Sequence, residues 1–461
     1  MSRRPGGLAL LLHSHMPYVE GFGTWPFGEE WLWEAVASVY VPLLDVIDGH
    51  PVTLGLTPVL CDQFETMSEG AGERYAAFLR DVRAPIHVED AAGLERGGER
   101  ALAAEVRRAA ADYAFDVRAL DLVGEFGRLS GVELWTSAAT HAVLPLLATD
   151  AGLRLQLATG VASHERRFRH FGGGLWLPEC AYEPGLERDL PEHGVRVFCV
   201  DQTVAHGLGA PEQLDPVATE AGPVAVPIDW QTVQLVWNDR DGYPVHPVYR
   251  DYHRRTVHDL KPWNNGGGPY RHEQATALAR EHARDFLARA RDRLGDGGLL
   301  CCALDTELLG HWWYEGLTWL RAVLEEAPAA GVELVTVSEG VQRVDPVRRD
   351  LHPSSWGTAK DLSTWDSPLV AEIAFSARRA ELRTVAAAAR QGGGLERAAR
   401  ELLALQSSDW AFQVTRDLAA EYPLKRVRAH AAAHAEALLK DSAPRLRNLA
   451  PHLDLASLCA P

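Results

Sequence analysis

The sequence is poor in cysteine, and this excludes a disulfide-stabilised scaffold. Its 461 residues contain six cysteines, and no two of them form a C-x-x-C pair. Several lie inside apolar runs, where a thiol behaves as a small buried side chain. We therefore expect no disulfide framework and a reducing compartment, which indicates a cytoplasmic location. The cysteines are Cys61, Cys180, Cys199, Cys301, Cys302 and Cys459.

Long apolar runs are also missing. No stretch approaches the ~20 residues that a membrane-spanning helix needs, so we expect no contact with a membrane. Near the N-terminus two arginines precede an apolar run of only about five residues, whereas the core of a signal peptide needs ~7–15. Polar residues, His13-Ser14-His15, follow this run directly. We expect no signal peptide.

Basic residues are fewer than acidic ones. The chain has 46 Lys and Arg against 63 Asp and Glu, which gives a formal net charge of −17. Such a surface repels nucleic acids and anionic membranes. We expect a neutral or cationic partner, and no nucleic acid.

The sequence does contain eight short apolar runs, each of which ends in polar residues. Runs of this length suit strands that are buried on both faces, as in a parallel sheet. Amphipathic segments such as residues 272–294 lie between some runs and predict helices. Alternating strands and helices indicate an α/β fold, and in parallel barrels the catalytic groups gather where the strands end. The runs lead into His13, Cys61, His141, Glu179, Asp201, Asp229, Asp305 and Ser338.

Two regions depart from this alternation. Residues 94–130 are rich in Ala, Glu and Arg and predict an insertion of helices. From Asp366 onward no strand is expected, and Pro368 stands early in a predicted helix. The sequence therefore predicts a catalytic domain over residues 1–350 and an α-helical C-terminal domain over residues 351–461.

Two carboxylates follow predicted strands in unusual surroundings. Glu179 stands in "LWLPECAYEPG" and Asp305 in "CALDTELLGHWWYEG". Paired carboxylates on either side of a glycosidic bond are required for glycoside hydrolysis and transglycosylation. One attacks the anomeric carbon, and the other protonates the leaving oxygen and needs a raised pKa. Glu307 competes with Asp305 for the second role, because both would lie on one side of an extended strand.

Histidines and tryptophans add candidates for sugar binding. His13 and His15 face one side of a strand, which suits binding of a sugar hydroxyl, ligation of a metal with a carboxylate, or a structural hydrogen-bonding pair. The chain has 14 tryptophans, whose rings can stack on apolar sugar faces or fill a core. Trp230 and Trp312 lie near polar residues, and His311 precedes Trp312, so we include all three as candidates.

Five segments of the chain resemble, in order, the signature regions of glycoside hydrolase family 57. They are "HSHMPY", "GLTPVLCDQ", "GLWLPECAYEPGLE", "LDTELLGHWWYEG" and "SSWGTAKDLSTWD". "ELWTSAATHAVLPLL", "QSSDWAF" and "DWQTVQLVWNDRDGYPVHPVYRDYH" are similar to further segments of that family's α-1,4-glucan branching enzymes. The resemblance extends from about residue 8 to about residue 430.

This resemblance implies a distorted (β/α)7 barrel with a helical C-terminal domain, so the eight runs are one too many for the barrel. It implies a retaining mechanism in which Glu179 is the nucleophile and Asp305 the general acid/base, with carboxyl groups ~5–5.5 Å apart. No metal or cofactor is expected. The matching positions for sugar binding are His13, His15, Gln63, His141, Trp356, Asp361, Trp365 and Trp410.

The sequence departs from the family pattern in two places. Lys360 stands in "WGTAKD", where many relatives have two glycines before the aspartate, and could alter a donor or acceptor subsite. The segment 260–274 looks shorter than in many branching enzymes and is expected to form a flexible glycine-rich loop near the cleft. A short loop would favour hydrolysis, because lids exclude water from the glycosyl-enzyme.

Four functions are consistent with these residues. The first is a 1,4-α-glucan branching enzyme that acts on an α-glucan polysaccharide or oligosaccharide. The second is an α-amylase-type hydrolase or a 4-α-glucanotransferase with the same machinery. The third is a metal-dependent, deacetylase-like enzyme that uses His13 and His15. The fourth is a non-catalytic glucan-binding protein.

Overall fold

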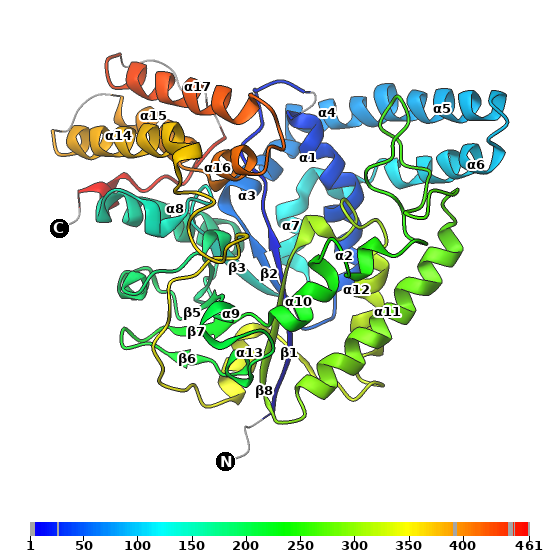
Figure 1. Cartoon of the computed structure of the whole chain (residues 1–461). Coiled ribbons are helices and arrows are strands. Elements are labelled where there is room, and N and C mark those ends of the chain that lie inside the picture. Colours follow the sequence, from blue (N-terminus) through cyan, green and yellow to red (C-terminus); the bar gives the residue numbers. More distant parts are fainter. Residues whose placement is uncertain (1–4, 25–26, 391–393, 441–445, 447, 460–461) are drawn as a thin grey trace.

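The computed structural model describes residues 5–24, 27–390, 394–440, 446 and 448–459. Within them a single curled sheet has the strand order β6-β7-β5-β4-β3-β2-β1-β8, with β9 beside β1 (Figure 1). All neighbours are parallel except β6 and β7. The strands are β1 (Pro5–Ser14), β2 (Thr53–Leu56), β3 (Glu133–Ser137), β4 (Gly174–Trp176), β5 (Val197–Val200), β6 (Val217–Ala218), β7 (Val224–Pro227), β8 (Gly298–Asp305) and β9 (Leu334–Val335).

The sheet closes between β7 and β8. Ile228 forms a parallel bridge with Cys301, and the backbone N–H of Asp229 donates to the carbonyl of Cys301 at 2.8 Å. The barrel therefore has seven parallel strands, β1, β2, β3, β4, β5, β7 and β8, which confirms the expected (β/α)7 class. The eighth apolar run forms β9, whose two residues pair only with Leu8 and Ala9 of β1.

Both faces of the central strands are buried, which explains their continuous apolar runs. In β1, Leu8, Leu10 and Leu12 pack under the surrounding helices. The alternate residues Ala9 and Leu11 pack inside the barrel with side chains of β3, β4, β5, β7 and β8. By this alternation His13 at the end of β1 and Asp305 at the end of β8 face the barrel interior, and the two are register partners.

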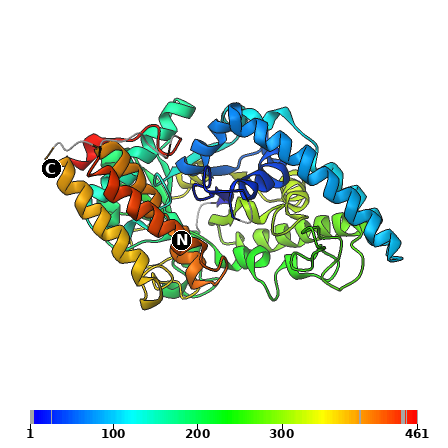
Figure 2. The same ribbon diagram turned by 90° about the horizontal axis from the view of Figure 1, so that it is seen from above.

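The helices surround the barrel, and the predicted insertion is present. It begins earlier than expected, at Ala84, where α5 and α6 form a hairpin that extends away from the C-terminal helices (Figures 1 and 2). These helices are α1 (Glu29–Ala35), α2 (Val41–Ile47), α3 (Pro58–Glu65), α4 (Gly70–Ala77), α5 (Ala84–Arg96), α6 (Arg100–Ala109), α7 (Leu122–Arg128), α8 (Asp150–Phe168), α9 (Thr203–His206), α10 (Trp230–Trp237), α11 (His272–Arg293), α12 (Gly316–Glu326) and α13 (Val337–Arg343).

After Asp366 the described residues form helices and no strand, as expected. They are α14 (Ala371–Ala388), α15 (Leu395–Leu405), α16 (Ser408–Thr415) and α17 (Tyr422–Ala437). Their apolar side chains share a core with Val59 of α3 and Leu155 of α8, so the helices pack on one side of the barrel (Figure 2). This places α16 above the carboxyl end of β1 (Figure 1).

The boundary at residues 350 and 351 stays a prediction. The segment that follows it is still bonded to the barrel, because Tyr182 and Ser354 exchange two backbone hydrogen bonds, of 2.8 and 2.9 Å. In the described part of the chain no helix combines the length and the apolar character that crossing a membrane requires.

Candidate active site

Glu179 stands on a strained turn at the rim of the barrel. Strand β4 ends at Trp176, and Glu179 and Cys180 then adopt left-handed backbone conformations with φ of 60° and 49°. Residues other than glycine rarely adopt such angles, and those that do are concentrated at functional sites. The backbone N–H of Cys180 bonds to Leu177 at 2.8 Å and that of Trp356 bonds to Glu179 at 3.0 Å, and both hold the turn.

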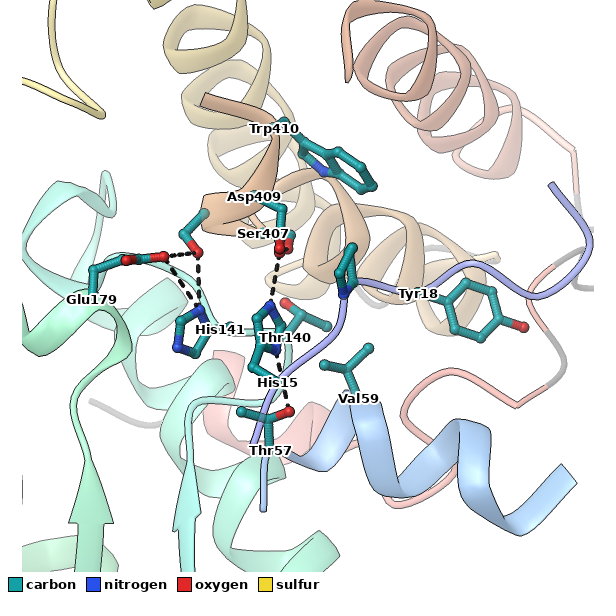
Figure 3. A network of polar contacts seen from close by, with 12 residues as sticks. His15, Tyr18, Thr57, Val59, Thr140, His141, Glu179, Ser407, Asp409 and Trp410 are labelled. Atoms are coloured by element: carbon teal, nitrogen blue, oxygen red, sulfur yellow. Dashed lines mark hydrogen bonds and ion pairs between the residues drawn. The ribbon is translucent and has the colours of Figure 1, made fainter. Parts of the chain in front are cut away.

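The Glu179 carboxylate accepts hydrogen bonds from two separate segments. The hydroxyl of Ser408, on α16, donates to Oε1 at 2.7 Å, and the indole N–H of Trp356 donates to Oε2 at 3.2 Å. Nδ1 of His141 lies 3.6 Å from Oε1 (Figure 3). Burial raises the pKa of Glu179 to about 7, while the Ser408 hydrogen bond opposes this rise. The donors therefore favour the ionised form that a nucleophile needs.

A chain of hydrogen bonds continues from Ser408 to the two histidines. Nδ1 of His141 lies 2.9 Å from Ser408 Oγ, and Nε2 of His141 lies 2.9 Å from Nε2 of His13. Because Ser408 gives its proton to the carboxylate, His141 donates from Nδ1 and accepts at Nε2 from His13. Burial, followed by neighbouring histidines, lowers the pKa of both rings, so both are neutral.

His15 belongs to a second network beside the first. Its Nε2 lies 2.8 Å from Oδ2 of Asp409 and its Nδ1 lies 3.2 Å from the Thr57 hydroxyl (Figure 3). Its ring stacks on that of His141 with centroids 4.0 Å apart. Within the described residues, no group of three or more His, Cys, Asp or Glu side chains is placed to hold a metal ion. The structure gives His13 and His15 hydrogen-bonding partners in the protein instead.

Asp305 has the surroundings of a proton donor. No described residue donates a hydrogen bond to its carboxyl group. Burial raises its pKa well above the usual value, and the negative charges of Glu307 and Asp409 add to the rise. The charge of Asp305 also contributes to the raised pKa of Glu179. Glu179 thus has hydrogen-bond donors that stabilise its ionised form, whereas Asp305 has none among the described residues. A nucleophile and a general acid require such a difference between two carboxyl groups.

Glu307 is held by other protein groups. Its Oε1 accepts a hydrogen bond from the Tyr40 hydroxyl and another, of 3.2 Å, from the backbone N–H of His15. Burial raises its pKa to about 7, and these hydrogen bonds oppose the rise. Because Glu307 supports the rim, Asp305 is the better candidate for the general acid.

Other expected sugar-binding residues turn out to be part of the protein core. Gln63 and Trp410 are both 0% exposed. The Gln63 amide bonds to the backbone of Val19 at 2.8 Å and of Pro17 at 3.1 Å, and the Trp410 indole donates to the carbonyl of Ala404 at 2.8 Å. Trp365 is also buried, in the C-terminal core. Protein surrounds these three side chains, so the structure gives them a supporting role, and their direct contact with sugar stays a prediction.

Two other residues expected to bind sugar, Asp361 and Trp230, contact protein groups at or beside the loop that follows Ser354. Asp361 is exposed, and its carboxylate accepts from the Ser363 N–H at 2.9 Å, so it stabilises a turn. One face of the Trp230 ring is covered by the Lys360 ammonium, 3.0 Å from its centroid. Trp356 lies beside Glu179 and packs against Trp176 with ring centroids 4.7 Å apart.

A cavity of about 630 Å³ extends from Asp409 toward the α5–α6 hairpin. Phe412 of α16 lines it, and so do His311 and Trp312, whose contact with substrate stays a prediction. The Trp312 side chain is 46% exposed and its ring lies 4.5 Å from that of Tyr252, which makes an aromatic wall. Glu179 does not line this cavity, but Asp409 does, and the charge of Asp409 contributes to the raised pKa of Asp305.

The glycine-rich segment 260–274 borders the same cavity through residues 260–262. Its tip is hydrogen-bonded rather than loose: Asn264 N–H bonds to Gly268 at 2.9 Å, and the Arg254 guanidinium bonds to Gly267 at 3.0 Å. The segment borders the cavity as expected, and its flexibility stays a prediction.

Several residues of the site were not expected from the sequence. Ser408 and Asp409 immediately precede Trp410 in "QSSDWAF", and the polar triplet Ser407-Ser408-Asp409 at the start of a helix is the sequence feature that could have indicated them. Tyr40, which holds Glu307, comes from a helical segment with no distinguishing pattern. Trp237 is 45% exposed and its ring is parallel to that of Trp356, with centroids 6.3 Å apart.

Comparisons with known proteins identify the family of the chain. The family model described as glycosyl hydrolase family 57 matches residues 113–352, and one described as 1,4-alpha-glucan branching enzyme, C-terminal, matches residues 376–445. A probable 1,4-alpha-glucan branching enzyme of Mycobacterium tuberculosis is 35% identical, over 94% of this chain and 91% of the relative. A 1,4-alpha-glucan branching enzyme of Thermococcus kodakarensis is 32% identical, over 92% of this chain and 72% of the relative.

Solved structures give the same result. A GH57-type branching enzyme from Pyrococcus horikoshii matches with a TM-score of 0.88 and 29% identity, over 98% of this chain and 97% of the other. The alpha-amylase AmyC from Thermotoga maritima has a TM-score of 0.78 at 23% identity, over 100% of this chain and 96% of the other, and shows the shared fold alone. The chain belongs to glycoside hydrolase family 57.

Proposed function

We propose that this protein is a retaining 1,4-α-glucan branching enzyme, which breaks an α-1,4 bond and transfers the released chain to a 6-hydroxyl. One observation carries the proposal. The nucleophile Glu179 receives its shortest hydrogen bond, 2.7 Å, from Ser408, which lies inside the segment matching the branching-enzyme C-terminal model. The names of the two relatives support the same activity.

The reaction proceeds in two displacements. Glu179 attacks the anomeric carbon while Asp305 gives its proton to the departing glycosidic oxygen, and a covalent glycosyl-enzyme forms. Asp305, now ionised, then takes the proton of an acceptor 6-hydroxyl, whose oxygen attacks the anomeric carbon and releases Glu179. Configuration is retained because the carbon is inverted twice.

The cavity beside Asp409 suits a glucan chain. It has room for more than one sugar unit, with an aromatic wall of Trp312 and Tyr252 against which apolar sugar faces can stack. Helix α16 covers the carboxyl end of the barrel and reduces access of water to the glycosyl-enzyme, which favours transfer over hydrolysis. Five of the six free cysteines are buried, which fits the proposed cytoplasmic location.

The test is linkage analysis after incubation with amylose. We expect new α-1,6 anomeric signals in the proton NMR spectrum, and shorter chains after digestion with a debranching enzyme. Glu179→Gln should abolish both while still binding glucan. New reducing ends without α-1,6 linkages would replace branching by hydrolysis. New α-1,4 chain lengths without either would indicate 4-α-glucanotransfer, and binding without turnover would indicate a non-catalytic protein.

A further inference from the structure

Lys360 brings a positive charge into the loop that supports the nucleophile. Its Nζ lies 2.9 Å from Oδ2 of Asp201 and 3.0 Å from the centroid of the Trp230 ring. The Asp201 side chain is 1% exposed and that of Lys360 is 19% exposed. Asp201 follows β5 and Trp230 begins α10 after β7, so this ammonium joins two strand ends of the barrel.

The backbone around Lys360 forms a tight turn. The N–H of Lys360 bonds to the carbonyl of Gly357 at 2.9 Å, and its carbonyl accepts from the N–H of Ser355 at 3.2 Å. Lys360 has a φ of 59°, in the left-handed region that favours glycine. A lysine in this conformation is held against its backbone preference, and the contacts of its side chain offset that cost.

The same turn carries Trp356, which contacts the nucleophile twice. Its backbone N–H bonds to the carbonyl of Glu179 at 3.0 Å, and its indole N–H bonds to the carboxylate at 3.2 Å. A continuous series of contacts therefore runs from Asp201 and Trp230, through Lys360 and the turn, to Glu179.

We propose that Lys360 is a positioning residue for glycosyl transfer. Its ammonium, held between the carboxylate of Asp201 and the ring of Trp230, fixes residues 355–361 so that Trp356 keeps its hydrogen bond to Glu179. The proposal rests on the proposed function in assigning Glu179 as the nucleophile. It also gives Trp230 a new role, because a ring face covered by an ammonium group supports Lys360 and is closed to a stacking sugar.

The first test is Lys360→Met, which keeps the length of the side chain and removes its charge. We expect kcat on amylose to fall about tenfold or more, because small displacements of catalytic groups have large effects on rate. KM should stay within about twofold, since the substrate cavity is unchanged. The acidic limb of the pH profile should move to higher pH, because a carboxylate that loses a donor binds its proton more tightly. Lys425→Met is the matched control, since Lys425 is 71% exposed.

A second measurement needs no substrate. Lys360→Met leaves the buried Asp201 carboxylate without its counter-charge and should lower the midpoint of thermal unfolding. Adding Asp201→Asn should recover part of that loss, because the unpaired charge is then gone. If the wild-type protein has no activity on any α-glucan, the proposed function is refuted, but this thermal comparison is still possible. Additive effects of the two substitutions on the thermal midpoint would then refute the proposed pairing of Lys360 with Asp201.

The positioning role is overturned if Lys360→Met matches Lys425→Met in kcat and pH profile, even where its thermal midpoint is lower. Should Lys360→Met fail to fold, Asp201→Asn alone carries the test, because it weakens the hold on the ammonium from the other side. An unchanged acidic limb in Asp201→Asn would then refute the proposal. Lys360→Arg, which keeps the charge, should retain more activity than Lys360→Met.

Discussion

Ser408→Ala tests whether a hydroxyl from α16 keeps Glu179, the proposed nucleophile, ionised. The substitution removes the 2.7 Å hydrogen bond to Glu179 Oε1 and leaves Nδ1 of His141 facing the same oxygen from 3.6 Å. A hydrogen bond to a charged group contributes about 1.5–3 kcal/mol. Because the His141 N–H takes over part of this stabilisation, we expect a loss of about 1.4 kcal/mol, which is a tenfold change in an equilibrium constant.

The sign follows from which form is stabilised. The hydroxyl donates to the carboxylate, so its loss makes the proton harder to remove and raises the pKa of Glu179 above its present value of about 7. The acidic limb of kcat/KM should move up by about one pH unit. At a pH well below the limb, kcat/KM should be about tenfold lower than that of wild type, and the difference should shrink in alkaline solution.

The assay is the rate of amylose conversion between pH 5 and pH 9, with chain transfer and reducing ends measured together. Ser130→Ala is the control, since that hydroxyl also donates to a carboxylate, Asp48, at 2.9 Å, but on the protein surface. A Ser408→Ala profile that is uniformly lowered, with its acidic limb where wild type has it, would show that the hydroxyl does not tune the ionisation of Glu179.

Three other predictions concern neighbouring groups. Asp305→Asn should lower kcat on amylose by about 10²-fold or more and much less on α-glucosyl fluoride, whose leaving group needs no proton; equal losses on both substrates would exclude Asp305 as the acid. Glu307→Gln should raise the thermal midpoint at pH 8 by about 2 °C and less at pH 5. Because the pKa of Glu307 is raised to about 7 in the folded protein, Glu307 lowers the free energy of unfolding as pH rises from 4.5 to 7. A thermal midpoint of Glu307→Gln that equals that of wild type at pH 8 would contradict this. Trp312→Ala should raise KM for long glucans with little change in kcat on glucosyl fluoride; an unchanged KM would exclude the aromatic wall from substrate binding.

The strands could be predicted from the sequence because their signal is local. Each run is continuous and apolar, since both faces of the barrel wall are covered, and the polar residue after it marks the rim. The strand that was missed, β6, has two residues and pairs antiparallel with β7, too short to leave a pattern. The short β9 was overpredicted, because its apolar run resembles that of a barrel strand although it pairs with only part of β1.

The two proposed catalytic carboxylates stood out for the same local reason, and Trp356 and His141 beside Glu179 were also expected, whereas Ser408 was not. Ser408 is 229 residues from Glu179 in the chain, and only the packing of α16 on the barrel brings the two together. The sequence did not distinguish tryptophans of the cavity wall from those of the core. Trp312 in the cavity wall and Trp410 in the core have similar neighbours in the sequence, and they differ in burial, which depends on the folded structure.

The hydrogen bond from Ser408 to Glu179 also has a consequence for synthesis of the chain. The residues of the barrel are complete by β9, long before Ser408 is added. A chain still attached to the ribosome therefore contains every barrel strand and both proposed catalytic carboxylates while Glu179 still lacks the Ser408 hydroxyl and the barrel lacks α16. Full transferase activity should therefore begin only when α16 has been made and packed on the barrel.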